Sequence, residues 1–185
     1  MLKKMRGFTL IELLIVVAII GILAALLIPN ALEAIQKAKQ KSCMKSIMTI
    51  STAAVDYITD HGDWTNVVQN GPMETGNAFL LAIQGFYIKI VPIMDPWNLA
   101  YKAYTGAAVN TLISTAGATT NSDDFAMISW GRNKAAGPVG VAQYSTTNPE
   151  GGLYVVSAMT DFDNDLAAWN GSWICGPRTT FATGS

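Results

Sequence analysis

The sequence has few of the residues that enzymes use for proton transfer and metal binding. Its 185 residues include one histidine and two cysteines, and these residues form no zinc-ligand or dithiol spacing. The sequence also lacks a glycine-rich phosphate loop and the sharp turn that presents a nucleophilic serine. The single histidine, His61, follows a predicted helix, where we expect water to surround it. We therefore predict that the protein is not an enzyme.

Charged residues are also scarce, at 14% of the chain, and they are unevenly distributed. After residue 46 the acidic side chains outnumber the basic ones by more than two to one, which makes nucleic-acid binding by this part unlikely on electrostatic grounds. The other basic residues form two groups on either side of a long apolar run: Lys3, Lys4 and Arg6 before it, and Lys37, Lys39, Lys41 and Lys45 after it. The second group could face lipid headgroups, acidic patches on neighbouring subunits, or water.

The apolar run covers residues 8–28 and contains one charged residue, Glu12. At about 1.5 Å per residue a helix of this length is roughly 30 Å long, which is enough to cross the core of a bilayer. The basic residues before the run place the N-terminus in the cytoplasm. A charged side chain inside a bilayer costs about 2.5–3.5 kcal/mol on insertion scales, so Glu12 is expected to have a function.

The helical pattern continues beyond Pro29 to about residue 60, because apolar residues from Met44 to Ile58 recur at helical spacing. A secretory signal peptide has a shorter apolar core, of about 7–15 residues, and does not continue into the mature protein as one helix. Pro29 is expected to bend this helix without ending it. Gly21 fits either close packing between helices or a weak point in the helix.

Residues 7–45, which begin with GFTLIELLIVVAIIGILAALLIP, resemble the N-terminal signature of type IV prepilins and type II secretion pseudopilins. The resemblance implies that a prepilin peptidase cuts between Gly7 and Phe8, so that residues 1–7 are a leader, and that the new amino group of Phe8 is methylated. It also implies that Glu12 pairs with the amino terminus of Phe8 on a neighbouring subunit. A buried carboxylate without a partner would be costly, so such a pair would select the correct register during assembly. Gly21 and Pro29 belong to the same assembly segment.

The remaining residues, 61–185, are predicted to form an outer domain with an antiparallel sheet. Asp95-Pro96-Trp97, followed by Tyr101, resembles the segment before the first strand of the major pseudopilins. The overall prediction is therefore a pilin-like α+β fold, in which the helix at 8–60 packs on this sheet. We expect a short helix within residues 76–88, strands at 125–130 and 152–159, and surface loops or insertions at 105–124 and 131–150.

Asp161, Asp163 and Asp165 alternate along the chain and offer oxygen ligands at a spacing that a calcium loop could use. The run is not an EF-hand, because Leu166 and Ser172 stand where the glycine and the bidentate glutamate would be. Resemblance to the major pseudopilins, which bind calcium in a C-terminal loop, implies Ca²⁺ as the one candidate cofactor. A solvated acidic loop is the alternative.

Two further features remain open from the sequence. Cys43 and Cys175 could form a disulfide in an oxidising compartment, although two free thiols are the default expectation. The five tryptophans, Trp64, Trp97, Trp130, Trp169 and Trp173, are expected to pack in the core or in subunit contacts rather than to form a carbohydrate platform.

The leading hypothesis is a structural one, in which the protein is the major subunit of a helical type IV pilus filament. The resemblance then implies further copies of the chain, the prepilin peptidase, an inner-membrane assembly platform, minor pilins and membrane lipid as partners. The subunit would start in the inner membrane and end in an extracellular pilus. One alternative is the major pseudopilin of a periplasmic type II secretion pseudopilus. A rival of another class is a membrane-anchored binding protein that never polymerises.

Overall fold

The computed structural model describes residues 8–113, 117 and 119–178. The chain divides into an N-terminal unit, Met1–Lys37, and a C-terminal unit, Ala38–Ser185. One long helix and a sheet that is mostly antiparallel make up the described residues, which confirms the predicted α+β class. The predicted leader, residues 1–7, and with it Gly7, lies outside the described residues.

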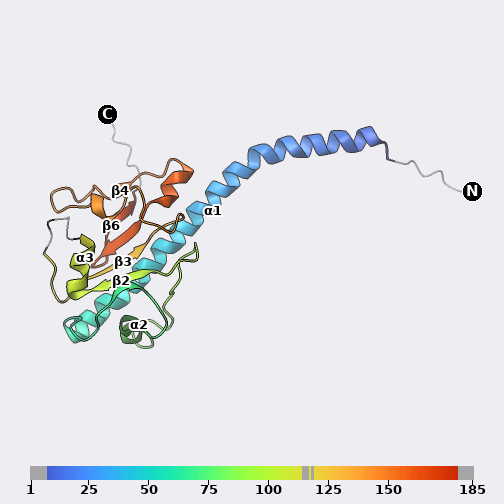
Figure 1. Cartoon of the computed structure of the whole chain (residues 1–185). Coiled ribbons are helices and arrows are strands. Elements are labelled where there is room, and N and C mark those ends of the chain that lie inside the picture. The colour runs from blue at the N-terminus through green and yellow to red at the C-terminus, as the bar shows by residue number, and fades with distance from the viewer. Residues whose placement is uncertain (1–7, 114–116, 118, 179–185) are drawn as a thin grey trace, which may run out of the picture. The chain divides into compact units, whose positions relative to one another are not determined.

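Helix α1, Leu10–His61, belongs to both units (Figure 1). It continues past Pro29, although proline cannot donate a backbone hydrogen bond to the preceding turn. Within the C-terminal unit α1 buries one face. The residues buried on that face are Gln40, Cys43, Ile47, Ile50, Ser51, Ala53, Ala54 and Tyr57. The Gln40 amide also donates a hydrogen bond to the Tyr154 hydroxyl at 3.1 Å, which ties this part of α1 to the sheet.

The sheet has six strands among the described residues, in the order β1-β2-β3-β5-β6-β4. Their bounds are β1 Asn70–Pro72, β2 Lys102–Thr105, β3 Phe125–Ser129, β4 Leu153–Tyr154, β5 Leu166–Trp169 and β6 Ser172–Pro177. All pairs are antiparallel except β4 with β6, which is parallel. The strand predicted at 125–130 is confirmed by β3, whereas the one predicted at 152–159 is reduced to two residues.

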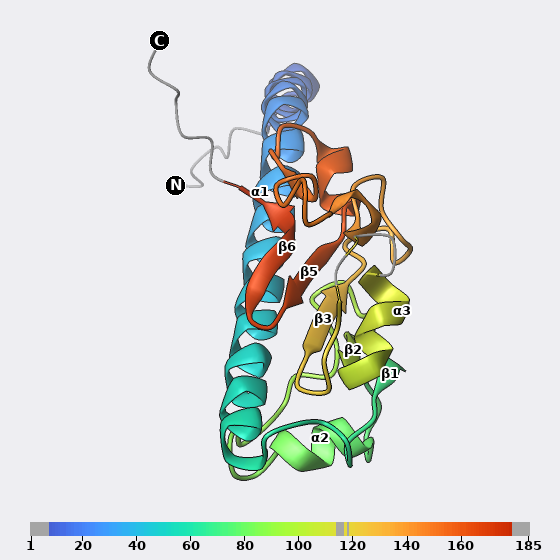
Figure 2. The ribbon, with the colours of Figure 1, turned by 90° about the vertical axis from the view of Figure 1, so that its left-hand side faces the viewer.

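Each face of the sheet supports its own hydrophobic core. Figure 2 shows α1 running along one side of the sheet. Successive side chains of a strand point to opposite faces. Phe125 and Met127 therefore pack with α1 and with the short helix α2, Ala78–Ile83, while Ala126 and Ile128 pack with α3, Val109–Ile113. The short helix predicted within 76–88 is thus present as α2.

The segment 105–124 was predicted to be a surface loop, and this prediction is wrong in part. Residues Gly106–Ala108 form the 3₁₀ helix η1, and α3 follows directly. Val109 and Ile113 lie one helical turn apart, and both are fully buried in the second core. Leu112 packs against the same core and is partly buried. The helix was not predicted because a helix of five residues is too short to show a helical period in a polar, alanine- and threonine-rich segment.

The segment 131–150 is mostly irregular, as predicted, but it does not lie wholly on the surface. It contains the 3₁₀ helix η3, Val141–Gln143, whose Val141 is buried in the second core. Its backbone also accompanies the acidic loop: the N–H of Val139 donates to the Asn164 side chain at 3.1 Å, and the N–H of Asp165 donates to the Val139 carbonyl at 3.0 Å.

The Asp95-Pro96-Trp97 segment forms a turn organised by one buried carboxylate. Asp95 Oδ1 accepts hydrogen bonds from the backbone N–H groups of Trp97 and Leu99, at 3.0 and 2.9 Å, and Oδ2 accepts one from the Ser129 hydroxyl at 2.7 Å. Asn98 within the turn has a positive φ of 64°. The turn therefore joins the start of β2 to the end of β3, while Trp97 is buried in the first core.

Candidate assembly site

The apolar part of α1 in the N-terminal unit is not covered by any of the described residues. Among the described residues α1 is the one helix long and apolar enough to cross a membrane, and none of its apolar window is buried. Phe8, before the helix, is 75% exposed, and Leu10 is 81% exposed. Other large exposed side chains here are Ile11, Leu13, Leu14, Ile15, Val16, Val17, Ile19, Ile20, Ile22, Leu23, Leu26, Leu27 and Ile28. So much apolar surface requires lipid or other chains around it.

Glu12 lies in the first turn of α1 and interacts with Thr9, which precedes the helix. The backbone N–H and the hydroxyl of Thr9 donate to Glu12 Oε2 at 2.8 and 2.6 Å, and the N–H of Glu12 donates to the Thr9 hydroxyl oxygen at 3.3 Å. This reciprocal pattern is a capping box, in which two side chains satisfy backbone groups at the start of a helix. Both Thr9 donors use Oε2, and the Glu12 side chain is exposed, so the carboxylate can also reach a partner outside the chain.

Gly21 and Pro29 both lie inside α1. A Cβ atom added to Gly21 would meet nothing within 4 Å, so no close contact within the chain requires a glycine there. The Asn30 amide donates to the Leu26 carbonyl at 3.5 Å, a local hydrogen bond beside the proline. Neither residue has a structural role within the described chain beyond its place in the helix.

The three aspartates that were candidates for calcium binding each have a different partner. Asp161 Oδ2 accepts hydrogen bonds from the N–H groups of Ser157 and Ala158, both at 2.7 Å. These bonds lower the pKa of Asp161. Asp163 forms a bidentate ion pair with Arg132, at 2.7 Å to Nε and 2.9 Å to the guanidinium Nη2. The three carboxylates therefore do not converge on one point.

Asp165 is buried and accepts a hydrogen bond from the N–H of Gly137 at 2.8 Å. Burial raises its pKa to about 6, against the opposing influence of this N–H group and of Lys102. Its neighbour Cys175 donates its thiol to the Asp165 carbonyl at 3.2 Å, and burial raises the pKa of that thiol to about 12. Cys43 and Cys175 are both buried free thiols.

These contacts are a poor fit to a calcium ion. Calcium needs six to eight oxygen ligands around one point, and the described residues contain no group of three or more acidic, histidine or cysteine side chains that could hold a metal. The Arg132 guanidinium already provides the positive charge beside Asp163. The described side chains of Asp161, Asp163 and Asp165 thus do not form one calcium-binding group, and calcium binding by this loop stays a prediction.

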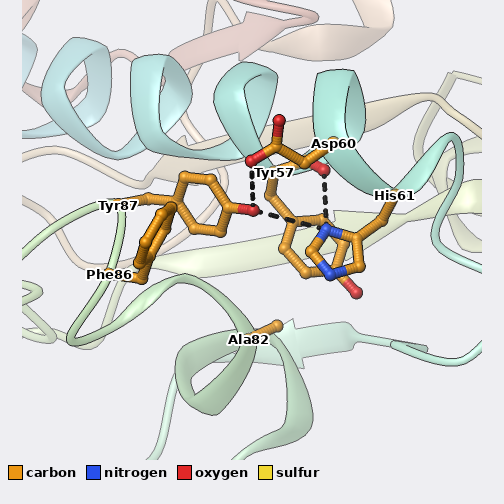
Figure 3. Close-up of a pocket in the computed structure, with 6 residues that line it drawn as sticks. All are labelled: Tyr57, Asp60, His61, Ala82, Phe86 and Tyr87. Atoms are coloured by element: carbon orange, nitrogen blue, oxygen red, sulfur yellow. Dashed lines mark hydrogen bonds between the residues drawn. The ribbon is translucent and has the colours of Figure 1, made fainter.

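A shallow hollow of about 710 Å³ lies beside the C-terminal end of α1 (Figure 3). The Tyr87 hydroxyl donates to Asp60 Oδ2 at 2.8 Å and lies 3.4 Å from Nδ1 of His61. His61 is exposed, as predicted, but its ring stacks on Tyr57 with centroids 4.2 Å apart. Burial and the Asp60 hydrogen bond raise the pKa of Tyr87 to about 12, so its hydroxyl remains a donor at neutral pH. The arrangement holds the side chain of Asp60 in place.

The N-terminal residues that contain this exposed apolar run also match known proteins. Residues 2–28 match the model of the prokaryotic N-terminal methylation motif. The chain is also 36% identical to the type II secretion system core protein G of Vibrio cholerae, over 112 residues that make up 55% of this chain and 73% of that protein. This chain belongs to the type IV pilin and type II secretion pseudopilin family.

Two further family members show where the likeness lies. The type IV major pilin protein PilA of Myxococcus xanthus is 42% identical over 77 residues, which are 40% of this chain and 34% of that pilin. The core protein G of Dickeya chrysanthemi is 26% identical over 177 residues, which are 91% of this chain and 88% of that protein. None of these names describes an enzyme. No solved structure matches the chain significantly.

Several features of this pseudopilin-family chain were not inferred from its sequence, although local signals existed for two of them. The residues Thr9 to Glu12 contain the spacing of a capping box. Asn170-Gly171, both with positive φ, forms the tight turn between β5 and β6, and this dipeptide is a strong hairpin signal. The pairing of Arg132 with Asp163 joins two distant segments and has no local signal.

Proposed function

We propose that this chain is a structural subunit of a helical filament, namely a type IV pilus, and that it has no catalytic role. The observation that carries the proposal is the exposed apolar part of α1 in the N-terminal unit, none of which is buried among the described residues. A single chain cannot cover this surface. Lipid would cover it first, and the same part of α1 from neighbouring subunits would cover it in the filament.

Processing and localisation are part of the same proposal. A prepilin peptidase would cut between Gly7 and Phe8, and Phe8 would be methylated, as the match to the methylation motif supports. The subunit would lie in the inner membrane with its N-terminus in the cytoplasm before assembly, and an assembly platform with minor pilins would add it to the filament. Cleavage would give Phe8 a positive amino group, the partner that we propose for Glu12 of an adjacent subunit.

A type II secretion pseudopilus is the second candidate for the same filament role. The observation in its favour is the length of the alignment with the core protein G of Dickeya chrysanthemi, which covers 91% of this chain. Electron microscopy at native expression would separate the two. Long extracellular filaments are expected for a pilus, and a short periplasmic assembly for a pseudopilus.

The direct test replaces Glu12 by glutamine. Glutamine can keep the capping box with Thr9, so Glu12→Gln removes the charge and keeps the hydrogen-bonding group that helps to start the helix. We expect normal membrane insertion and normal processing of this variant. We also expect the sheared filament fraction to fall to roughly a tenth of wild type or less, because the pair with the Phe8 amine is lost.

The matched control is Glu33→Gln, which removes a carboxylate from the same helix. Glu33 pairs with Lys37 of its own chain at 2.6 Å, so its loss should leave filaments unchanged. Normal filament yield from Glu12→Gln would refute the proposed pairing. An uncut N-terminus by mass spectrometry, together with a monomer in detergent, would refute the filament role itself and favour a membrane-anchored binding protein.

A further inference from the structure

The part of α1 that belongs to the C-terminal unit presents a continuous exposed stripe opposite its buried face. At 100° per residue, the stripe falls within an arc of roughly 100°. Its members are Lys41, Lys45, Thr49, Thr52, Asp56, Thr59 and Asp60, all exposed. In Figure 2 no described helix or strand covers the side of α1 that faces away from the sheet, and the loop that carries Tyr87 contacts the C-terminal end of α1 at Asp60. We refer to these seven residues as the charged stripe.

The charged stripe has opposite charges at its two ends. Lys41 and Lys45 lie at one end, and Asp56 and Asp60 lie at the other, about 22 Å away along the helix. The Debye length is about 8 Å at physiological ionic strength. The two ends therefore cannot neutralise each other within one chain.

The middle of the stripe is uncharged and has only short side chains. Two threonines lie there, Thr49 and Thr52, and they donate their hydroxyls to backbone carbonyls of the preceding turn at 2.8 and 2.9 Å. Thr59, between the two aspartates, does the same at 2.9 Å. No long side chain therefore stands between the two charged ends. A second helix could approach this surface between the two charged ends, whereas Phe86 and Tyr87 lie beside Asp56, Thr59 and Asp60 at the acidic end.

We infer that the charged stripe binds the charged stripe of a second copy of this chain, in parallel and displaced along the helix by about 22 Å. The step from Lys41 to Asp56 contains as many residues as the step from Lys45 to Asp60. One displacement therefore pairs both lysines of one copy with both aspartates of the other. The inference rests on the proposed filament, because anchoring in one membrane makes neighbouring copies parallel.

The side chain of Asp60 is already held in one orientation for such a contact. The Tyr87 hydroxyl, shown in Figure 3, holds Asp60 Oδ2 at 2.8 Å. A carboxylate that is already oriented loses less conformational freedom on pairing. By contrast, Lys37 already has a partner, Glu33, within its own chain.

The first test is a charge swap in the full-length protein. We expect the pair Lys41→Glu and Lys45→Glu to reduce the sheared filament fraction by roughly tenfold, and the pair Asp56→Lys and Asp60→Lys to do the same, since attraction becomes repulsion at each contact. Combining all four substitutions in one chain should restore filaments. Control pairs with the same changes elsewhere are Lys89→Glu with Lys134→Glu, and Glu74→Lys with Asp123→Lys, all at exposed positions.

The second test is cysteine cross-linking, which also covers the case of a charge variant that fails to fold. The native Cys43 and Cys175 are buried, so they leave the surface free of reactive thiols among the described residues. In filaments, Lys41→Cys combined with Asp56→Cys should form disulfide-linked ladders on mild oxidation. Lys41→Cys combined with Asp60→Cys, which an antiparallel pair would favour, should not.

The outcomes separate this inference from the proposed function. If the wild-type chain forms no filament, the proposed function fails first. If wild-type filaments form but the charge reversals leave the yield unchanged, the inference is wrong and the filament role stands. A lack of restoration by the four-residue swap, or cross-links through positions 41 and 60 instead of 41 and 56, would also overturn it.

Discussion

Helix α1 has two parts that differ in the burial of their apolar side chains. In the N-terminal unit Ile20 is 58% exposed, and its large apolar neighbours are exposed as well. In the C-terminal unit Ile47 and Ile50 are fully buried against the sheet. The same backbone geometry therefore supports one part that is covered by its own chain and another that requires a cover from outside.

The two parts of α1 differ in the pattern of their apolar residues. An apolar stripe with charged residues between its members belongs to a helix that packs on its own domain, whereas apolar residues all around the helix indicate lipid or a bundle of helices. The polar face of the packed part is the charged stripe. The N-terminal unit has no such face within residues 10–28, where Glu12 is the one charged residue.

The largest expected effect comes from replacing one isoleucine by alanine in each of the two parts of α1. Ile47→Ala should lower the free energy of unfolding of the C-terminal unit by about 2–5 kcal/mol, because it leaves a cavity in the first core. Ile20→Ala should leave that free energy unchanged. Thermal or chemical denaturation of the detergent-solubilised full chain, followed by the fluorescence of buried Trp64, measures both. Equal effects would contradict the division of α1 into two parts.

The buried Asp165 gives a pH dependence that belongs to the C-terminal unit alone. Its pKa of about 6 in the folded state exceeds the ordinary value of 3.8, so between these values the folded protein holds more protons than the unfolded one. Stability should therefore fall as the pH rises from about 4 to about 6, by an amount on the order of 1–3 kcal/mol. Asp165→Asn should remove this fall.

The Asp165 experiment needs a difference measurement, because other carboxylates also titrate. Asp161 has a lowered pKa and acts in the opposite direction, since its stabilising contribution is lost as the pH drops below its ordinary range. The wild-type curve minus the Asp165→Asn curve isolates the one group. Two parallel curves between pH 4 and pH 6 would rule out the raised pKa.

The smallest expected effect concerns the acidic loop, where Arg132 provides the positive charge that a metal would otherwise bring. Arg132→Ala should destabilise the C-terminal unit by about 1–2 kcal/mol, because it leaves Asp163 without its bidentate partner. The control is Arg178→Ala, which breaks a more exposed pair with Glu150 and should cost at most about 0.5 kcal/mol. Adding calcium or a chelator should leave the melting temperature of the wild-type chain unchanged. A clear increase with calcium would support calcium binding by the acidic loop.

The sequence predicted the elements that depend on local pattern. Long helical periodicity predicted α1, and a run of β-branched and aromatic residues predicted β3. It did not predict α3, because a helix of five residues is too short to show a helical period. Strands β5 and β6 were not predicted, because their segment was interpreted as an acidic loop on account of its aspartates. Asn170-Gly171 nevertheless marks the turn between them.

The residues of the candidate site were also predictable from the sequence only in part. Phe8 and Glu12 could be identified from a contiguous motif, whereas the partners of Asp161, Asp163 and Asp165 could not. The carboxylates alternate along the sequence, but Asp161 and Asp163 lie in the 3₁₀ helix η4, Met159–Asp163, while Asp165 follows it, and each has a different partner. The Arg132 partner comes from a loop 31 residues away, and only the folded chain brings it there.

The central claim is that other copies of the chain cover the apolar part of α1 in the assembled state. The most direct measurement places a cysteine at Ile20 and, as a control, at the exposed Asn110 of α3. A water-soluble thiol reagent is then applied to purified filaments and to filaments dissociated in detergent-free denaturant. We expect Ile20→Cys to be protected in filaments and labelled after dissociation, while Asn110→Cys is labelled in both. Equal labelling of the two cysteines in intact filaments would contradict the account.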